Sequence, residues 1–335
     1  MKRKPKIYIY GLCNVYYESF YIQGLKEHFG VKKVFFNISK FPKFGIYDAM
    51  AIIIEFENHK IKLCIDSNDR NEIIKHQLDW CDIYGKINFN EDVFPENNSY
   101  KIKAIGPSFG IKIWNFTTTF IIAITNFIRF YKNIPLKKFF LSNYKAQYER
   151  LPLNRYLIPL DIKKKPRNYI FFIGSIWKQE PKTNEFRANF IKSCKKNKSI
   201  HFEGGFAPRS DGNKLTFQDI VLDNPYTLKQ YLNKTKHSAV VFNTPAVNNC
   251  HGWKLGEFLA MGKAIISTPF YNKMPIDLED NKNIIFLKSG EDADISKKLE
   301  NIINNEELQL KLEQNSRNYF QEYLMPQKVI ARLLM

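Results

Sequence analysis

The stretch His251–Phe270 constrains what this chain can fold into more than any other. Its apolar residues that recur at the spacing of one helix face are Leu255, Phe258 and Leu259. Gly262 then stands where a helix ends in the left-handed conformation, and the apolar run 264–266 predicts a buried strand. A loop, a helix, a glycine and a strand in this order indicate an α/β fold, with the helix N-terminus at the carboxyl edge of a parallel sheet.

The start of this predicted helix has the features of an anion site. Free backbone N–H groups and the positive end of the helix dipole suit a diphosphate. Lys254 falls in the first turn, where lysine opposes the dipole and an anionic ligand would favour it. Gly252 lets a phosphate approach the backbone, and His251 either donates to a phosphate oxygen or serves as a cap or packing residue. The plain alternative is a packed helix with Lys254 and Glu257 as a solvated pair.

This stretch resembles the donor-binding element of B-type glycosyltransferases. Retaining enzymes of glycosyltransferase family four carry E-x7-E followed by A-x-x-G-x-P-V-I, and the sequence from Glu257 to Ile266 is similar to the second half of that pattern. The resemblance implies that Glu257 holds the donor ribose, while the position of the first glutamate is occupied by Asn249. The α1,3-fucosyltransferases carry E-K-L-x-x-A-L-x-A-G-x-x-P-V, which this chain matches at Lys254, with Trp253 in place of the glutamate. That resemblance implies that Lys254 meets the donor diphosphate.

The order of the predicted elements indicates two α/β domains. Strands and helices alternate through both halves of the chain, which suits mostly parallel sheets. The expected fold class is therefore α/β, with two facing, Rossmann-like, doubly wound domains, a layout that the resemblance to B-type enzymes also implies. The expected boundaries are 1–155 for an acceptor-binding domain, 160–322 for a nucleotide-sugar-binding domain and 323–335 for a helix that crosses back to the first domain.

Within this layout, the segments 50–56 and 60–65 are predicted to form a hairpin, and the segment 116–131 is predicted to be a helix. The proline-rich segment 133–166 suggests the connection between the domains. Gly204-Gly205, at the end of a strand, suggests a tight turn, with a close approach to the nucleobase as the alternative. The other expected strands are 7–10, 33–37, 82–88, 101–105, 169–173, 200–203, 239–242 and 283–287. The other expected helices are 17–29, 71–78, 183–197, 225–235, 291–304, 306–323 and 327–334.

Three carboxylates of the first domain are candidate catalytic bases. Glu18 follows the first strand-to-helix loop, against which B-type enzymes place the acceptor. Asp66 and Asp69 follow a strand at the carboxyl edge of the sheet, where a carboxylate can deprotonate an acceptor hydroxyl. Each position also has a structural reading, because a glutamate in a first helical turn suits the dipole and Asp69 suits a cap of the helix over 71–78.

Two cations follow the first strand of the second domain, where B-type enzymes often supply a cation to the donor phosphates. They are Lys178 and Arg187, and the alternative for both is a solvated surface position. The complete predicted donor site is therefore Lys178, Arg187, His251, Gly252, Lys254 and Glu257.

Motifs for other cofactors and for metals are missing from the sequence. No G-x-G-x-x-G follows the first strand and no G-x-x-x-x-G-K-[ST] occurs, so NAD and ATP sites of these types are not supported. No D-x-D flanked by apolar strands and no C-x-x-C or H-x-x-H pair occurs, so we expect no metal and no cofactor beyond the donor substrate. The five cysteines lack metal spacing and suggest reduced thiols in a cytoplasmic protein.

The net charge of +18 is concentrated in the first half of the chain. Residues 1–165 hold 27 Lys and Arg against 15 Asp and Glu, which suits an anionic lipid surface, nucleic acid or a phosphorylated acceptor, or serves solubility alone. The helix over 116–131 is too short and polar to span a membrane, but with the lysines after it a peripheral position on the inner membrane face is expected as an equal alternative to core packing. The N-terminus suggests a first strand rather than a signal peptide.

Together these features predict a cytoplasmic glycosyltransferase of EC class 2.4 that moves a hexose or deoxyhexose from a nucleotide sugar to a saccharide or lipid-linked acceptor. The family resemblance implies a role in surface polysaccharide or lipopolysaccharide biosynthesis. One alternative is a sugar-nucleotide epimerase of the same fold, which the basic, aromatic first domain disfavours. The other is a non-enzymatic nucleic-acid-binding protein, which is disfavoured because no nucleic-acid motif accompanies the charge.

Overall fold

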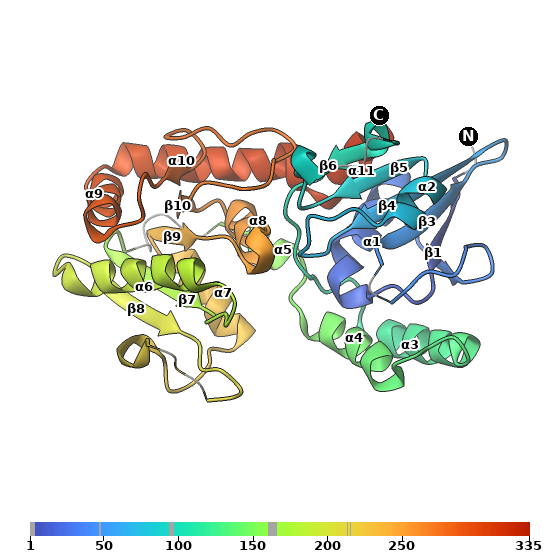
Figure 1. The fold of residues 1–335 in the computed structure, drawn as a ribbon, viewed down its shortest axis with the longest axis horizontal. Coiled ribbons are helices and arrows are strands. Elements are labelled where there is room, and N and C mark those ends of the chain that lie inside the picture. Colours follow the sequence, from blue (N-terminus) through green and yellow to red (C-terminus); the bar gives the residue numbers. More distant parts are fainter. Residues whose placement is uncertain (1–3, 47, 94–96, 160–165, 213, 215) are drawn as a thin grey trace. The chain divides into compact units, whose positions relative to one another are not determined.

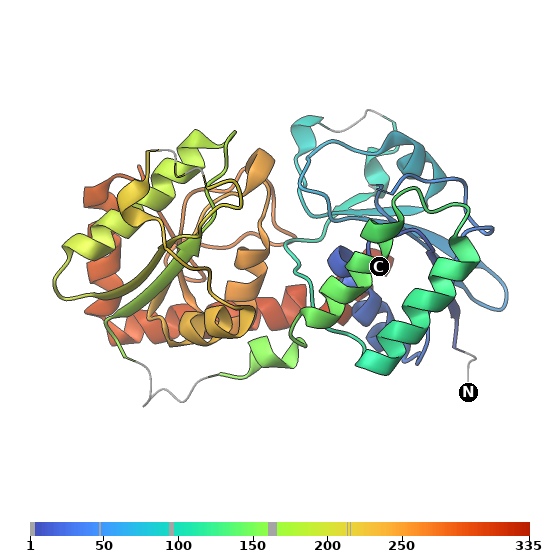
Figure 2. The ribbon, with the colours of Figure 1, turned by 90° about the horizontal axis from the view of Figure 1, so that it is seen from below.

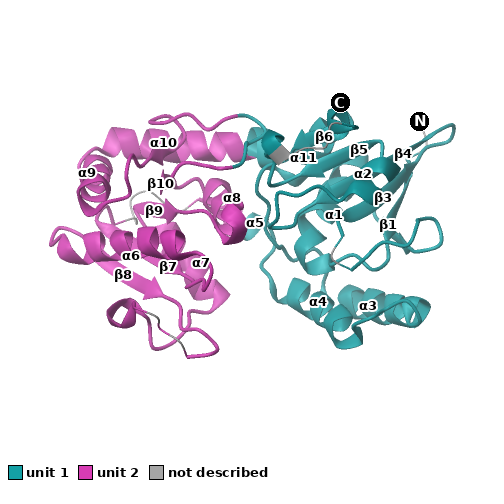
Figure 3. Cartoon of the chain, in the orientation of Figure 1, with its two compact units in different colours: residues 1–155, 272–276, 321–335 teal, residues 156–271, 277–320 magenta. Residues whose placement is uncertain are grey.

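The computed structural model describes residues 4–46, 48–93, 97–159, 166–212, 214 and 216–335. The chain divides into two compact units, which Figure 3 colours separately. Unit 1 comprises Met1–Arg155, Asn272–Ile276 and Gln321–Met335, and unit 2 comprises Tyr156–Tyr271 and Asp277–Phe320. The segment Asn272–Ile276 belongs to unit 1 although it lies inside the stretch that the sequence assigned to the second domain. Both units are α/β, which is the predicted fold class.

Unit 1 is built on a six-stranded sheet with the order β2-β1-β3-β4-β5-β6 (Figure 1). Its strands are β1 Lys6–Tyr10, β2 Phe35–Asn37, β3 Met50–Glu55, β4 Lys60–Asp66, β5 Ile83–Lys86 and β6 Ile102–Ala104. The strand β3 is antiparallel to both of its neighbours and forms the predicted hairpin with β4, whereas the other pairings are parallel. The carboxyl ends of β1, β4, β5 and β6 therefore share one edge of the sheet.

The helices of unit 1 are α1 Val15–Phe29, α2 Lys75–Trp80, α3 Phe116–Phe130, α4 Lys137–Glu149 and α11 Pro326–Leu334. The helix α1 begins where the Asn14 side chain accepts from the backbone N–H of Tyr16, and it ends at Gly30, whose φ of 60° is left-handed. The C-terminal helix α11 packs on α1 so closely that a Cβ on Gly24 would lie 2.4 Å from the carbonyl oxygen of Pro326. The last helix of the chain thus packs within unit 1.

The helix α4 shows that the interpretation of 133–166 as a plain connection was wrong. Pro135 and Pro152 flank this helix instead of interrupting it, and the short α5 Asn154–Leu157 follows it. The helix α4 packs against both α1 and α3, and Figures 1 and 2 show α3 and α4 side by side in unit 1. The helix expected over 71–78 begins only at Lys75 and has no side-chain cap, so the proposed capping role of Asp69 was also wrong.

Unit 2 contains two all-parallel sheets, β7-β8 and β11-β10-β9. They meet where the backbone N–H of Ala239 donates to the carbonyl of Tyr169 at 2.7 Å. The strands are β7 Tyr169–Gly174, β8 His201–Phe206, β9 Val240–Asn243, β10 Ala264–Ser267 and β11 Ile285–Phe286. The helices are α6 Pro181–Lys196, α7 Leu228–His237, α8 Trp253–Met261, α9 Asp292–Ile303 and α10 Glu306–Tyr319.

The core of unit 2 lies between these strands and helices. Its centre is the stacked pair Phe190 and Phe242, whose ring centroids are 4.3 Å apart. Gly204 and Gly205 lie inside β8, so their interpretation as a tight turn was wrong. Gly204 has a φ of 124°, and a Cβ there would lie 1.8 Å from the carbonyl oxygen of Phe172 on β7, so only glycine fits this close approach of two strands.

A five-residue π-helical turn, Phe320–Leu324, follows α10 and precedes α11. In the part of the chain that the structure describes, every helix is either too short or too polar to cross a bilayer.

Candidate functional site

The helix α8 of unit 2 starts and ends as its sequence predicted. Gly262 closes it with a left-handed φ of 61°, and β10 follows directly. At its start, Gly252 is the N-cap residue and provides no side-chain hydrogen bond to the first turn. Because β9 and β10 are parallel neighbours, this helix start lies at the carboxyl edge of the sheet, where α/β folds bind ligands. The N–H groups of the first turn are therefore placed to receive an anion.

Lys254, in the first turn of α8, points back towards β7. Its ammonium donates to the carbonyl of Ile173 and lies 5.3 Å from the ring centre of Phe172. Burial lowers the pKa of Lys254 to about 7, the cation of Arg187 adds to this effect, and the carboxylate of Glu257 opposes it. A lysine whose charge is poised near neutral pH gains its proton when an anion arrives.

Glu257 is buried on the next turn of α8. Its Oε2 atom accepts a 2.8 Å hydrogen bond from the hydroxyl of Tyr231 on α7, so it is not the solvated partner of Lys254 that the plain alternative describes. Its contact with a donor ribose stays a prediction. The position expected for the first family-four glutamate, Asn249, has a left-handed φ of 56°. Asparagine tolerates this conformation better than glutamate, which gives the departure from the family pattern a backbone reason.

Arg187 lies in α6 and joins the carboxyl ends of two strands. Its guanidinium donates to the Thr244 hydroxyl at 2.8 Å and to the carbonyls of Ser175 at 2.7 Å and Pro245 at 3.1 Å. Burial lowers the pKa of Arg187 to about 10. These bonds fix the loops after β7 and β9, and a direct contact of Arg187 with phosphate stays a prediction.

Lys178 is exposed after β7 and pairs with Asp211 at 2.9 Å. Arg209 pairs with the same carboxylate at 2.8 Å and donates to the carbonyl of Ile176 at 2.6 Å. Arg209 was not among the cations predicted from the sequence, although its position three residues after β8 indicates a cation at the carboxyl edge. Both cations therefore lie in the loops that follow the first two strands of unit 2.

His251 is buried before α8, with its ring edge-on to Phe270 at a centroid distance of 5.1 Å. Phe270 follows β10 and also lines a pocket of about 500 Å³ at the carboxyl ends of β10 and β11. This volume is within the range of small-molecule sites. We call it the unit 2 edge pocket; its lining residues are Lys182, Glu185, Phe186, Asn189, Thr268, Pro269, Phe270, Tyr271, Leu287, Lys288, Ser289, Gly290 and Glu291.

Thr268 gives this pocket an unsatisfied polar group. Its residue is 3% exposed, and its Oγ1 atom has no hydrogen-bond partner among the residues that the structure describes. Since buried polar atoms are nearly always paired, this hydroxyl is an exception beside the pocket. Thr268 could not be predicted from the sequence, because only the folded chain shows that its hydroxyl has no partner among the described residues.

At the carboxyl edge of the unit 1 sheet, Glu18 in α1 and Ser67 after β4 come together. The Ser67 hydroxyl donates to Oε1 of Glu18 at 2.6 Å, and Oε2 of Glu18 has no hydrogen-bond partner within the described ranges. Burial raises the pKa of Glu18 to about 8, with the Ser67 bond acting against this and the Asp66 charge adding to it. A carboxyl with a pKa near neutrality and an oxygen available for a proton is suited to general acid–base work.

Asp66 is not the accessible carboxylate that the sequence analysis expected. Its Oδ2 atom lies 2.7 Å from the Lys86 ammonium in a fully buried ion pair, and it also accepts from the Tyr84 hydroxyl at 2.8 Å. Its Oδ1 atom accepts from the backbone and side chain of Asn68. Asp69 is exposed in the following loop, away from the core. Of the three predicted bases, Asp66 is therefore a buried structural group, and the roles of Glu18 and Asp69 as a base stay predictions.

Within the described residues, no group of three or more His, Cys, Asp and Glu side chains is arranged to hold a metal ion. The sequence Asp292-Ala293-Asp294, which strands do not flank, lies in the first turn of α9. There Asp292 accepts from the Ser193 hydroxyl, and Asp294 accepts from the backbone N–H groups of Lys288 and Ser289. Both carboxylates thus serve the local structure around that helix start.

No protein-family model and no curated protein matches the chain. Among solved structures, it is similar to a glycosyltransferase from Rickettsia africae ESF-5, at 12% identity and a TM-score of 0.44, over 78% of this chain and 66% of that one. It is also similar to WaaG, a glycosyltransferase involved in lipopolysaccharide biosynthesis, at 11% identity and a TM-score of 0.37, over 78% and 80% of the two chains. A Listeria monocytogenes protein assigned as a UDP-N-acetylglucosamine 2-epimerase is similar at 10% identity and a TM-score of 0.38, over 75% and 66%.

In fold, the chain is similar to glycosyltransferases. It spans 66% of the length of the Rickettsia enzyme and of the Listeria protein. All three TM-scores are below 0.5, so these likenesses assign no activity to this chain.

Proposed function

We propose that the chain is a glycosyltransferase that uses a nucleotide sugar as its donor. The observation that supports this most directly is the pairing of two features in unit 2. The start of α8 has a glycine N-cap that supplies no side-chain acceptor, and its positive dipole end suits a diphosphate. Phe270, whose ring contacts His251 just before α8, also lines the unit 2 edge pocket, where the Thr268 hydroxyl has no partner among the described residues. A nucleoside diphosphate carrying a sugar has the anionic and hydroxylated parts that these two features would take.

Glu18 of unit 1 is the proposed base. In the proposed transfer, the acceptor hydroxyl gives its proton to a carboxylate base, its oxygen forms a bond to the anomeric carbon, and the bond from that carbon to the diphosphate breaks. The departing diphosphate is stabilised by the N–H groups at the start of α8 and by Lys254, which becomes charged as the anion accumulates negative charge. Arg187 holds the loops around this position.

The finer points of the proposal rest on the family resemblance of the α8 motif. They are a hexose or deoxyhexose as the transferred sugar, a saccharide or lipid-linked acceptor, and a place in surface polysaccharide or lipopolysaccharide assembly. Donor binding through helix N–H groups and side-chain cations predicts transfer that survives EDTA.

The test is release of nucleoside diphosphate from a panel of nucleotide sugars, measured with and without saccharide acceptors. A transferase releases the diphosphate faster when its acceptor is present. Conversion of the sugar nucleotide to an epimer without any acceptor would instead support the epimerase alternative. Binding of nucleic acid without any nucleotide-sugar turnover would contradict the proposal and support the nucleic-acid alternative.

A further inference from the structure

The helix α3 of unit 1 buries a partly polar stripe and exposes apolar side chains. The residues that it buries against unit 1 are Thr119, Ala123, Asn126 and Phe130. Two of these four are polar, and Asn126 is paired with the Tyr144 hydroxyl of α4 at 3.0 Å. The spacing 119, 123, 126 and 130 follows one stripe of a helix, so the buried stripe is well defined.

The sides of α3 next to and opposite this buried stripe carry exposed apolar residues. Phe116 is 64% exposed, Phe120 58%, Ile121 57% and Ile128 69%, and Ile124 lies among them. We call these five residues the α3 outer face. Exposing these apolar side chains to water is unfavourable in free energy. An exposed apolar patch of this kind marks a surface that binds another molecule.

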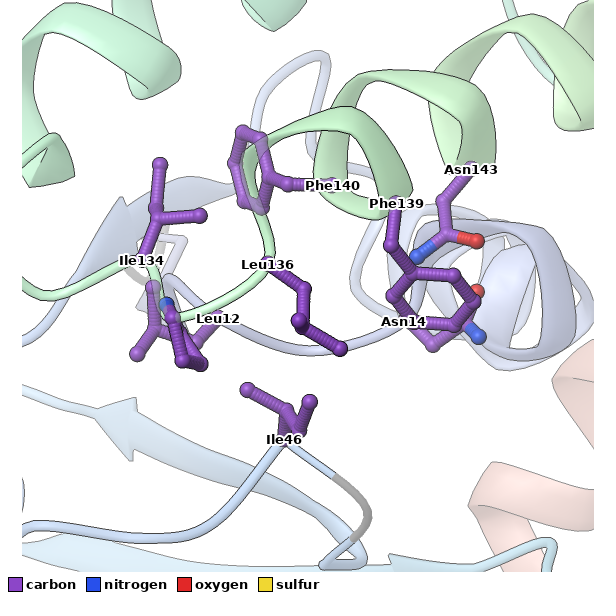
Figure 4. A pocket seen from close by; sticks show the side chains of 9 residues that line it. Leu12, Asn14, Ile46, Ile134, Leu136, Phe139, Phe140 and Asn143 are labelled. Carbon is purple, nitrogen blue, oxygen red and sulfur yellow. The ribbon is translucent and has the colours of Figure 1, made fainter.

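The apolar surface continues past the end of α3. Tyr131, Leu136 and Phe139 are exposed around the connection to α4. Figure 4 shows Leu136 and Phe139 beside Leu12, Ile46 and Ile134 at a small apolar pocket. That pocket has a volume of about 10 Å³, which is room for about one water molecule, so it is too small for a ligand.

Positive charge surrounds this surface. Between residues 111 and 150 the chain has seven Lys and Arg and a single acidic residue, Glu149. Lys132, Lys137 and Lys138 are exposed next to the end of α3, and the Lys137 ammonium lies 4.7 Å from the ring centre of Tyr131. The occupant of the surface must therefore be apolar at its centre and negatively charged at its edge.

A second copy of the chain does not meet this requirement. Two copies that pair through the same face would bring their own lysine clusters together, and like charges repel. An anionic lipid bilayer does meet it, because acyl chains receive the aromatic and aliphatic side chains while anionic headgroups face the lysines.

We propose that the α3 outer face and the lysines beside it dock unit 1 on the surface of an anionic bilayer. The helix lies in the interface and does not cross it, since its 15 residues span about 22 Å, which is less than the hydrocarbon core of about 30 Å. This surface is separate from the residues assigned above to donor binding and to the base. The membrane-docking proposal can therefore be tested independently of the proposed glycosyl transfer.

The test is flotation of the full chain with phosphatidylcholine vesicles, with and without phosphatidylglycerol, at low and at high salt. The chain is expected to float with the anionic vesicles at low salt and to lose at least tenfold in partition coefficient on neutral vesicles or at high salt. A chain that stays in solution with anionic vesicles at low salt, or that binds both kinds of vesicle equally, overturns the proposal.

Two triple variants locate the surface. F120Q/I121Q/I128Q and K132Q/K137Q/K138Q should each lower the partition coefficient at least tenfold, and the lysine variant about 100-fold at low salt. Their matched controls are Y100Q/I158Q/L310Q, which removes exposed apolar side chains elsewhere, and K192Q/K198Q/K297Q, which removes three exposed lysines of unit 2. Equal losses in the controls would contradict a localised docking surface.

These positions are exposed, so the variants should retain the fold and the nucleotide affinity of the wild type. Sedimentation velocity gives the remaining outcome. A dimer that F120Q/I121Q/I128Q dissociates, together with no vesicle binding, would show that a second copy covers the face and would overturn membrane docking.

Discussion

The Ser67 hydroxyl and the Glu18 carboxyl form a 2.6 Å hydrogen bond at the carboxyl edge of the unit 1 sheet, and burial raises the pKa of Glu18 to about 8. In the unfolded chain a glutamate has a pKa of about 4.3. Between these values the folded state holds a proton that the unfolded state releases. The free energy of unfolding therefore falls as the pH rises through this window, by up to about 1.4 kcal/mol per pH unit.

Glu18→Gln should abolish this pH dependence of the free energy of unfolding, and it should lower activity without lowering stability. The variant should be at least as stable as the wild type at pH 8, because it buries no ionisable group, while kcat should fall by about 10² or more if Glu18 is the base. Urea denaturation at pH 5, 6.5 and 8 together with steady-state kinetics measures both effects. Glu27→Gln, at the exposed end of the same helix, is the control and should change neither. Full activity in Glu18→Gln would eliminate Glu18 as the base.

Lys254 should take up a proton when a nucleoside diphosphate binds. Its pKa is about 7 in the free protein, because burial and Arg187 disfavour the charge, and a bound diphosphate would raise it. At pH 8 the lysine is mostly neutral before binding, so uptake approaches one proton and the affinity weakens as the pH rises above 7.

Calorimetry at pH 8 in two buffers with different ionisation enthalpies measures this proton uptake. Lys254→Met should abolish most of it. The same uptake in Lys254→Met as in the wild type would show that another group responds to the anion.

The buried pair Asp66 and Lys86 should be important for stability and not for chemistry. Asp66→Asn leaves the Lys86 ammonium without its buried counter-charge, which costs about 3–5 kcal/mol of unfolding free energy. Asp69→Asn, at an exposed position, should change stability by no more than about 0.5 kcal/mol. Denaturant titration of both variants decides this, and a stable but inactive Asp66→Asn would return Asp66 to the list of catalytic candidates.

The sequence predicted the elements that local rules determine. The helix α8, its end at Gly262 and the strand β10 follow from apolar spacing and one glycine, and α3 follows from a long apolar run. The helix α4 was missed because prolines on both sides resembled a linker. Gly204 was misread because its reason for being glycine is a carbonyl on the neighbouring strand, which no local pattern contains.

The candidate site was predicted only in part, for a similar reason. Lys254 and Glu18 were identified from their places in first helical turns. The partners that decide their chemistry, Ile173 and Ser67, are far away in sequence. Asp66 was taken for a base because its pairing with Lys86 depends on the register of two parallel strands.

Thr268→Val should not destabilise the free protein, but it should weaken the binding of nucleotide. Valine keeps the shape and removes a buried hydroxyl without a partner, so the free protein should be as stable or more stable, by up to about 2 kcal/mol. Nucleotide affinity should fall about tenfold, because a hydrogen bond to the ligand is lost.

Thr235→Val is the matched control for this variant. Its hydroxyl is also buried without a partner among the described residues, but it lies in α7 and does not line the unit 2 edge pocket. It should affect stability in the same direction and leave binding unchanged. Equal nucleotide affinity in Thr268→Val and Thr235→Val would show that the pocket does not take the nucleotide.

Calorimetric titration of the wild-type chain with UDP, GDP, CMP and dTDP, repeated with Lys254→Ala, tests the central claim most directly. One nucleotide should bind clearly better than the others, and Lys254→Ala should weaken it by about 1.5–3 kcal/mol, as expected for loss of a charge-assisted hydrogen bond. No binding of any nucleotide, or equal affinity in the wild type and Lys254→Ala, would contradict a donor site at the start of α8.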